Sequence, residues 1–243
     1  VEIKWNYPEA QQFVSFLYLI SGKNEKARQH LEIAHSIDPL SQETLFYQAY
    51  FHYRNENYQQ ALKIFDECLK NNPNNIPAYI VRSYCMLKLG KYDETIQFLE
   101  NMPKEIVVHD ERLGLLCLAN ILKKNEAETE KYLTQLTEKA KEPTAFQAHS
   151  YLYLAYANLG KSAEAFARAD KAIQLKSSVL LLSYTDPLAN SLKNDPRHDI
   201  YKKRLYRHPE EIVIQAPEKP SLLDPETADN YTQKLTSFIA EEE

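Results

Sequence analysis

The first half of this 243-residue sequence repeats itself every 34 residues, and three positions of the repeat show the period over four consecutive units. The first column is small (Ser15, Ala49, Ser83 and Cys117), the second is also small (Ala27, Ala61, Thr95 and Thr129), and the third is large and apolar (Leu31, Phe65, Leu99 and Leu133). A repeat of this length is one unit that cannot bury its apolar face alone, so successive units must stack. The period therefore predicts a stacked array.

Small residues, glycines and prolines fall at fixed places in the repeat. A small residue is needed where two helices cross at about 8–10 Å. Gly22, Gly90 and Gly160 lie between two helical stretches, where a left-handed conformation ends the first helix. Pro39 and Pro73 lie at unit boundaries, where a helix begins or has already ended. Together these positions predict an all-α chain of antiparallel helix pairs.

Two stretches carry the pattern most clearly, Tyr58-Gln-Gln-Ala-Leu-Lys-Ile-Phe-Asp-Glu-Cys-Leu-Lys-Asn-Asn-Pro73 and Leu159-Gly-Lys-Ser-Ala-Glu-Ala165. They resemble the tetratricopeptide repeat (TPR) family. The resemblance extends over residues 8–177 and implies a right-handed α-α superhelix, a TPR solenoid of about five helix pairs followed by capping helices. In such arrays the first helices of successive units line a concave face, where ligands usually bind.

The end of the chain departs from the repeat. Residues 178–206 break the period and predict a cap with a polar outer face. Three prolines within 207–223 predict an extended linker. Asp224 followed by proline and glutamate is typical of a helix start, and apolar residues recur at helical spacing after it. We therefore predict a TPR array with its cap over 1–206, a linker over 207–223, and a truncated helix over 224–243. That helix either docks on the array or leads towards a missing C-terminal domain.

Two further resemblances suggest a context for the array. Residues 184–197 resemble the segment that closes repeat arrays in bacterial regulators and class III nucleotide cyclases. Residues 221–243 are similar to the helix that precedes the helix-turn-helix domain in AraC-type bacterial transcription regulators. They imply a non-catalytic protein- or peptide-binding regulatory module of a transcription regulator, whose DNA-binding domain lies outside this fragment. The alternative is the TPR module of a signalling enzyme such as an adenylate or guanylate cyclase, with the catalytic domain outside it.

Eight residues on the expected first helices are candidates for contact with a partner. They are Phe16, Phe46, Tyr50, Tyr53, Arg54, Tyr84, Leu87 and Lys88. Such a concave groove would accept a protein or peptide, because tyrosine combines apolar area with a hydroxyl at low entropic cost. Alternatively, these rings pack among themselves or on a neighbouring helix. The array's other expected role is self-association. Family members that hold a terminal carboxylate need several basic residues and asparagines here, and this groove offers aromatics instead.

The sequence offers no catalytic residue, metal site or cofactor site, so we expect no enzyme activity. Its seven histidines do not converge, and no metal-ligand or phosphate-loop motif occurs.

The net charge is +2 over residues 1–208 and −7 over 209–243. This charge distribution lacks the clustered positive charge that nucleic-acid binding requires, so DNA would be reached only through the missing domain. No apolar run has membrane-spanning length. Three cysteines without paired spacing suit a reducing cytoplasm.

Overall fold

The computed structural model describes residues 7–102 and 109–206. The helices are α1 (Pro8–Ile20), α2 (Asn24–Ile37), α3 (Gln42–Arg54), α4 (Tyr58–Asn71), α5 (Ile76–Lys88), α6 (Tyr92–Asn101), α7 (His109–Lys123), α8 (Glu126–Lys139), α9 (Ala148–Asn158), α10 (Ser162–Gln174), α11 (Ser178–Ser183), the 3-10 helix η1 (Pro187–Leu192) and α12 (Arg197–Leu205). Within those ranges the chain contains no strand. The expected all-α array is confirmed.

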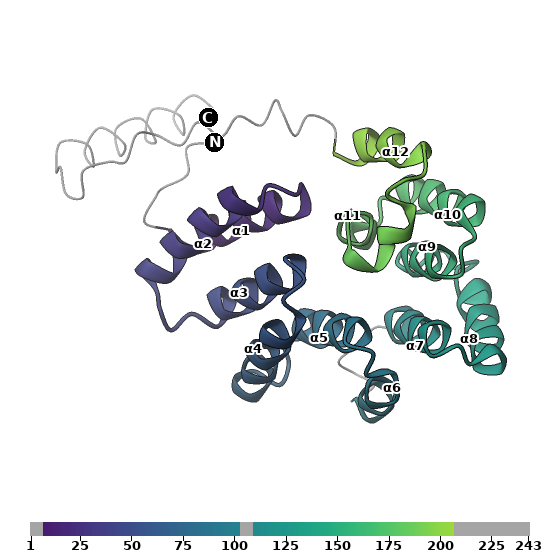
Figure 1. Cartoon of the computed structure of the whole chain (residues 1–243), viewed down its shortest axis with the longest axis horizontal. Coiled ribbons are helices and arrows are strands. Elements are labelled where there is room, and N and C mark those ends of the chain that lie inside the picture. The colour runs from purple at the N-terminus through teal and green to yellow at the C-terminus, as the bar shows by residue number, and fades with distance from the viewer. Residues whose placement is uncertain (1–6, 103–108, 207–243) are drawn as a thin grey trace, which may run out of the picture. The chain divides into compact units, whose positions relative to one another are not determined.

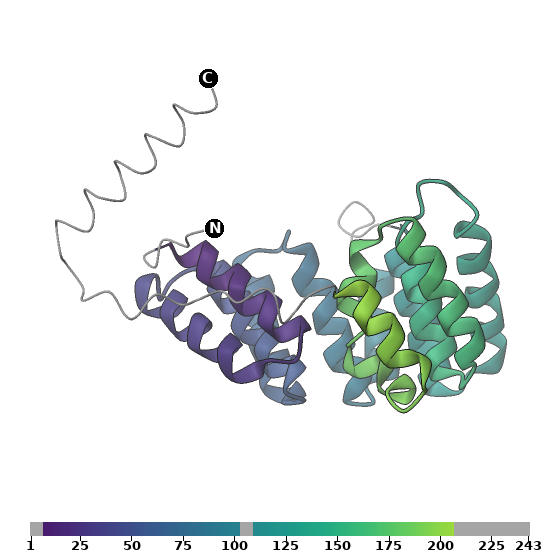
Figure 2. The same ribbon diagram turned by 90° about the horizontal axis from the view of Figure 1, so that it is seen from above.

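Ten of these helices form five consecutive pairs, α1/α2, α3/α4, α5/α6, α7/α8 and α9/α10. The first helices also contact one another in order, from α1 to α3, α5, α7 and α9. Figure 1 shows this row on the inner side of the curve that the pairs describe, and Figure 2 shows the same pairs from above. The predicted five pairs with capping helices are therefore present, and the first helices supply the concave face.

The small columns of the repeat are the places where helices cross. Ser15, Ala49, Ser83 and Cys117 are all fully buried. The hydroxyl of Ser15 in α1 donates a hydrogen bond to the Ala27 carbonyl in α2, with 2.8 Å between the oxygens. This contact joins the two small columns directly. A larger side chain at either position would separate the helices, because the interior is already close-packed.

The turns inside the pairs share one backbone conformation, also at a spacing of 34 residues. Gly22, Glu56, Gly90 and Lys124 all have positive φ, between 61° and 79°. In each turn the next residue donates its amide to a carbonyl five residues earlier, as Lys91 does to Met86 at 2.9 Å. This bond closes a Schellman motif, which satisfies carbonyls at the end of the first helix. Glutamate and lysine occupy two turns where the other units have glycine.

The fourth glycine, Gly114, has a packing role. It lies inside α7, which contacts α9. A Cβ atom built on Gly114 would overlap the ring and Cβ of Tyr151, whose side chain is fully buried in α9. Glycine at this position allows α7 and α9 to approach, and Tyr151 fills the space left by the missing side chain.

In the described part of the chain, no helix combines the length and apolarity needed to cross a membrane. The exposed Lys202 and Lys203 lie on α12, where the sequence predicts a polar outer face. The predicted linker over 207–223 and helix over 224–243 lie outside the described residues. Their boundaries, and the choice between docking and leading into a further domain, stay predictions.

Candidate partner-binding groove

After α11 the chain turns into the concave side of the array, and we call residues 184–191 the clasp. Figure 1 shows this green segment inside the curve of first helices. Asp186 begins η1: its Oδ1 accepts the Leu188 amide at 2.8 Å, and Pro187 occupies the first position of the turn. An aspartate followed by proline favours such a start, because the carboxylate satisfies a free amide and proline needs no partner.

The clasp is bound on one side by the first two helix pairs. The Thr185 hydroxyl donates to the Ile20 carbonyl at the end of α1, at 3.0 Å. Arg54 Nη2 donates to both the carbonyl and the hydroxyl oxygen of Thr185, each at 2.9 Å. The Tyr53 hydroxyl donates to Asp186 Oδ1 at 2.7 Å. These bonds join residues more than 130 positions apart in the sequence.

On the other side, the third and fifth pairs hold it. Lys88 Nζ donates to the Pro187 carbonyl at 3.3 Å. Asn158 in α9 donates to the Leu188 carbonyl at 2.9 Å. The Ser191 hydroxyl donates back to the Ala157 carbonyl, also at 2.9 Å. The clasp therefore ties four of the five pairs to one short segment.

The carboxyl group of Asp186 is the most buried charge in this arrangement, with its side chain 3% exposed. Burial raises its pKa, while Arg54, the Leu188 amide and the Tyr53 hydroxyl oppose that rise. Burial and the Asp186 charge together raise the pKa of Tyr53 well above its usual range. Tyr53 therefore stays protonated and donates to Asp186 at neutral pH.

The structure places all eight predicted groove residues along one aromatic surface, but half of them are covered. Tyr50, Tyr53, Tyr84 and Leu87 are buried, and Phe16 and Phe46 are half-buried. Arg54 and Lys88 are bonded to the clasp. The rings form a continuous series: Phe16 to Tyr50 at 5.8 Å, Tyr50 to Tyr53 at 6.3 Å and Tyr53 to Tyr84 at 6.1 Å between centroids. Among the predicted residues, the rings that stay partly accessible therefore lie at the α1/α3 end, and the role of the groove in binding a partner stays a prediction.

The open end includes two residues outside the predicted set, Phe13 and Tyr47. Phe13 is 54% exposed and stacks on Phe16 with 6.3 Å between ring centroids, and Tyr47 lies 6.1 Å from Phe16. Gln12 helps to fix the position of α1 relative to α3, because its side-chain amide donates a hydrogen bond to the Thr44 hydroxyl at 2.8 Å. The signal was present in the sequence, since Phe13 and Tyr47 are themselves 34 residues apart.

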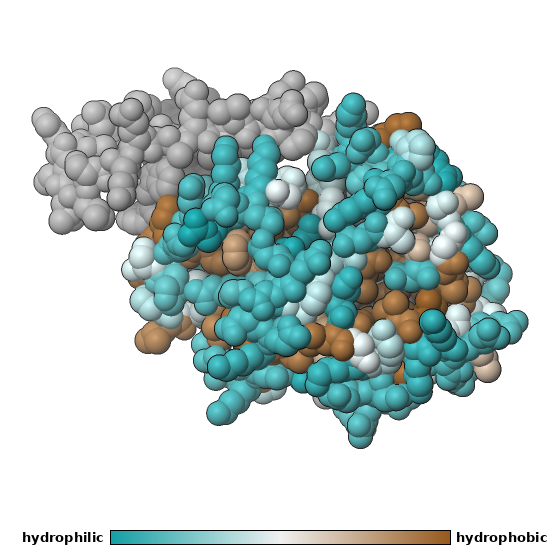
Figure 3. Space-filling view, in the orientation of Figure 1, coloured by the Kyte–Doolittle hydropathy of each residue, from teal (hydrophilic) through white to brown (hydrophobic). Residues whose placement is uncertain are grey.

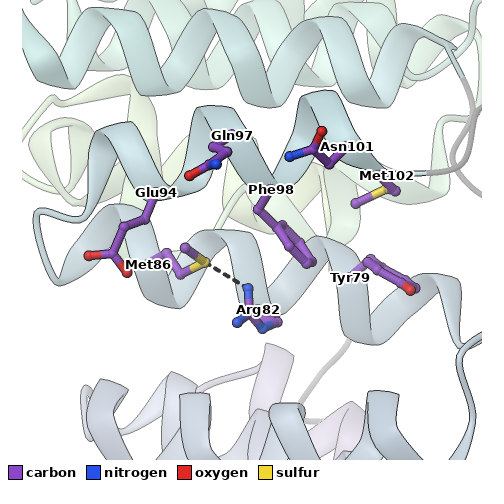
Figure 4. A pocket seen from close by; sticks show the side chains of 8 residues that line it. All are labelled: Tyr79, Arg82, Met86, Glu94, Gln97, Phe98, Asn101 and Met102. Carbon is purple, nitrogen blue, oxygen red and sulfur yellow. Dashed lines mark hydrogen bonds between the residues drawn. The ribbon is translucent and has the colours of Figure 1, made fainter.

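A second concave feature is a cavity of about 430 Å³ between α5 and α6 (Figure 4). Its one basic side chain, Arg82, is already engaged. Its guanidinium lies 4.3 Å from the Phe98 ring centroid, donates to Asp66 Oδ1 at 2.7 Å, and approaches Met86 Sδ at 2.9 Å. We assign no ligand to this cavity, because its two charged side chains, Arg82 and Glu94, are both engaged within the chain.

Apolar surface also occurs away from the α1/α3 end of the groove. On the face shown in Figure 3, hydrophobic side chains gather over α7 and α9, and hydrophilic ones cover most of the rim. Apolar surface is therefore not confined to the α1/α3 end of the array. Over 7–102 and 109–206, no group of three His, Cys, Asp or Glu side chains is placed to hold a metal ion.

Comparison with known proteins relates the chain to repeat proteins. The family described as anaphase-promoting complex, cyclosome, subunit 3 matches residues 21–102. Hsp70-Hsp90 organizing protein 3 of Arabidopsis thaliana is 32% identical over 76 residues, which are 31% of this chain and 14% of that protein. The match thus spans about a seventh of that relative's length.

Two solved structures resemble the fold. A thermophilic TPR protein of Thermus thermophilus superimposes with a TM-score of 0.55 at 19% identity, covering 76% of this chain and 98% of that one. A tetratricopeptide repeat protein of Parabacteroides merdae gives a TM-score of 0.50 at 17% identity, covering 82% of each chain. The fold is a TPR-type solenoid.

Proposed function

We propose that this chain is a non-catalytic, cytoplasmic regulatory module that binds a protein or peptide at the α1/α3 end of its concave groove. The observation that carries the proposal is the exposed part of the aromatic series, where Phe13 and Phe16 stack with no described segment of the chain covering Phe13. Aromatic side chains on a concave surface are common anchors of protein interfaces. The three cysteines are free and buried, which suits a reducing compartment.

We further propose which kind of effector domain this module serves. The similarity of residues 221–243 to the helix before an AraC-type DNA-binding domain favours a bacterial transcription regulator, which would contact DNA only through that further domain. The resemblance of residues 184–197 to the closing segment of cyclase arrays favours the alternative, a nucleotide cyclase. Sequencing the reading frame after Glu243 separates them. A helix-turn-helix pair supports the first, and a cyclase domain without such a pair rejects it.

Binding is tested with a displayed peptide library selected on the full chain, followed by titration of the enriched peptides. Substitution of the buried Tyr50 or Tyr84 would test folding rather than binding, because truncating a buried ring costs about 3–5 kcal/mol. Phe16→Ala is the better test. We expect it to weaken peptide binding by roughly ten-fold, while Phe146→Ala, which removes an exposed ring elsewhere, leaves affinity unchanged.

Equal affinity of the Phe16→Ala variant and the unchanged protein would remove this end of the groove from consideration. Failure of the library to yield any saturable peptide would reject peptide binding itself. Sedimentation of the unliganded chain at increasing concentration tests self-association as the other use of this surface.

A further inference from the structure

The open end of the groove is formed by four aromatic side chains, Phe13, Phe16, Phe46 and Tyr47, which we call the aromatic mouth. Phe13 is more than half exposed and the other three are half-buried. Phe46 contacts Tyr47 edge-on, with 5.3 Å between centroids, and Phe16 lies between the two helices. Phe13 therefore offers an exposed ring to a ligand, and the other three rings are partly accessible beside it.

Carboxylates border the aromatic mouth on both helices. Glu9 precedes Phe13 by four residues in α1, and Glu43 precedes Tyr47 by four residues in α3. Residues four apart lie on one face of a helix. Both glutamates are exposed. Burial raises the pKa of Tyr47, and the Glu43 charge raises it further, which places that carboxylate near the ring.

The pairing of acid and ring repeats with the period of the array, since Glu9 and Glu43 are 34 residues apart, as are Phe13 and Tyr47. Acidic residues in the first turn also interact favourably with the positive end of their own helix. That interaction accounts for a carboxylate at each helix start. It does not account for an aromatic ring one turn further along the same face of both helices.

Within the described residues, the two helices that form this end carry little positive charge. Helix α1 contains no lysine or arginine, and Arg54 is the only one in α3. Arg54 is directed to Thr185, and Lys88 of α5 is directed to Pro187. The clasp thus engages the two basic groups expected in the groove and leaves an aromatic, acidic surface beyond it.

We propose that the aromatic mouth binds a short segment of a partner protein in which lysine or arginine side chains alternate with apolar ones. This inference rests on the proposed function and names the class of partner. A cation above the face of an exposed ring gains attraction from the ring quadrupole. A nearby carboxylate adds charge complementarity, which chiefly sets specificity. An acidic ligand gains neither the cation–ring attraction nor the charge complementarity, and it is repelled by Glu9 and Glu43.

The length of α1 sets an upper limit on the length of the site along this helix. Helix α1 has 13 residues, which corresponds to about 20 Å. An extended peptide of about six residues covers that length. The clasp closes the groove beyond it, so a longer ligand must end or turn away before Thr185.

The test uses the full chain and three fluorescent hexapeptides in which the same three apolar residues alternate with three lysines, three glutamines or three glutamates. Fluorescence anisotropy measures their affinities at low and high salt. We expect the lysine peptide to bind roughly ten-fold more tightly than the glutamate peptide, with glutamine between them. Added salt should reduce the difference in affinity between the lysine and glutamate peptides, because salt screens exposed charges.

Two sets of variants locate the site. Glu9→Lys with Glu43→Lys should reverse the order of the lysine and glutamate peptides. Glu126→Lys with Glu130→Lys makes the same change in net charge on the exposed face of α8 and should leave the order intact. Phe13→Ala with Tyr47→Ala should weaken binding of every peptide. Circular dichroism confirms that each variant is folded.

Tighter binding of the glutamate peptide, or the same change in both charge-reversal pairs, would overturn this inference. The proposed function would still stand if Phe13→Ala with Tyr47→Ala weakened binding of the peptides, because that result places them in the groove whatever their charge. If none of the three peptides binds, the inference is rejected, and the library selection described above decides the proposed function separately.

Discussion

Glu56 and Lys124 hold a left-handed backbone at positions where Gly22 and Gly90 hold it without cost. Their φ values of 61° and 62° place the Cβ close to the following carbonyl oxygen, which costs about 1–2 kcal/mol for residues other than glycine. The hydrogen bonds of the turn and the packing of the two helices over-determine this conformation. The side chains of both residues are exposed.

Glu56→Gly should therefore stabilise the array. Relief of the strained backbone outweighs the extra entropy of glycine in the unfolded chain, and we expect a gain of about 0.5–1 kcal/mol in the free energy of unfolding. Urea denaturation followed by circular dichroism measures it. Lys63→Gly, at an exposed position inside α4, is the matched control and should lose about 1 kcal/mol. A loss for Glu56→Gly similar to the control's would show that this turn carries no strain.

At the scale of the elements, periodic features could be predicted and contact-dependent ones could not. Columns such as Leu31 to Leu133 indicate helix pairs, because each position meets the same neighbour in every unit. Gly114 belongs to no column, and the sequence assigns it no role. Gly114 makes room for Tyr151, which packs from another unit into the space that a side chain at position 114 would fill. A contact that occurs once leaves no period in the sequence.

Gly114→Ala should destabilise the contact between α7 and α9. The added methyl must displace the buried Tyr151 ring, and overpacking of this kind costs about 1–3 kcal/mol. The better helix propensity of alanine recovers at most about 1 kcal/mol of that. Denaturant unfolding should therefore show a net loss. Glu130→Ala on exposed α8 should change stability by less than about 0.5 kcal/mol. An unchanged or raised stability for Gly114→Ala would mean that the two helices do not approach closely at Gly114.

At the scale of the whole array, the clasp is the feature that sequence reasoning identified only in part. The sequence predicts a cap over residues 178–206, which include Asp186 and Pro187. The position of the clasp in the concave face depends on Tyr53, Arg54 and Ile20, more than 130 residues away. Such bonds, two of them to backbone carbonyls, can be made by many residue types. The predicted groove residues were therefore brought together, while the segment that covers half of them could not be foreseen.

Asp186→Ala should open the array. It leaves the Tyr53 hydroxyl and the Leu188 amide buried without an acceptor, at a cost of about 2–4 kcal/mol. With the clasp released, the radius of gyration of the full chain from small-angle X-ray scattering should rise. Asp195→Ala is the control, because Asp195 also starts a turn before proline but bonds only within its own outer loop and to Ser162 through Arg197. It should leave the radius unchanged, and equal radii for all three proteins would show that the clasp does not hold the curvature.

The clasp also bears on how a gene for such a chain can change. Repeat arrays commonly gain or lose whole units by duplication or deletion, since each unit contacts only its neighbours. Here Thr185 must meet the carbonyl of Ile20 while Ser191 meets that of Ala157. One more or one fewer unit between them would alter the span that an eight-residue segment has to bridge. The clasp, which lies outside the repeats, thus favours a fixed number of five units between its two anchoring carbonyls. We expect insertions to be better tolerated in the outer turns than as whole repeats.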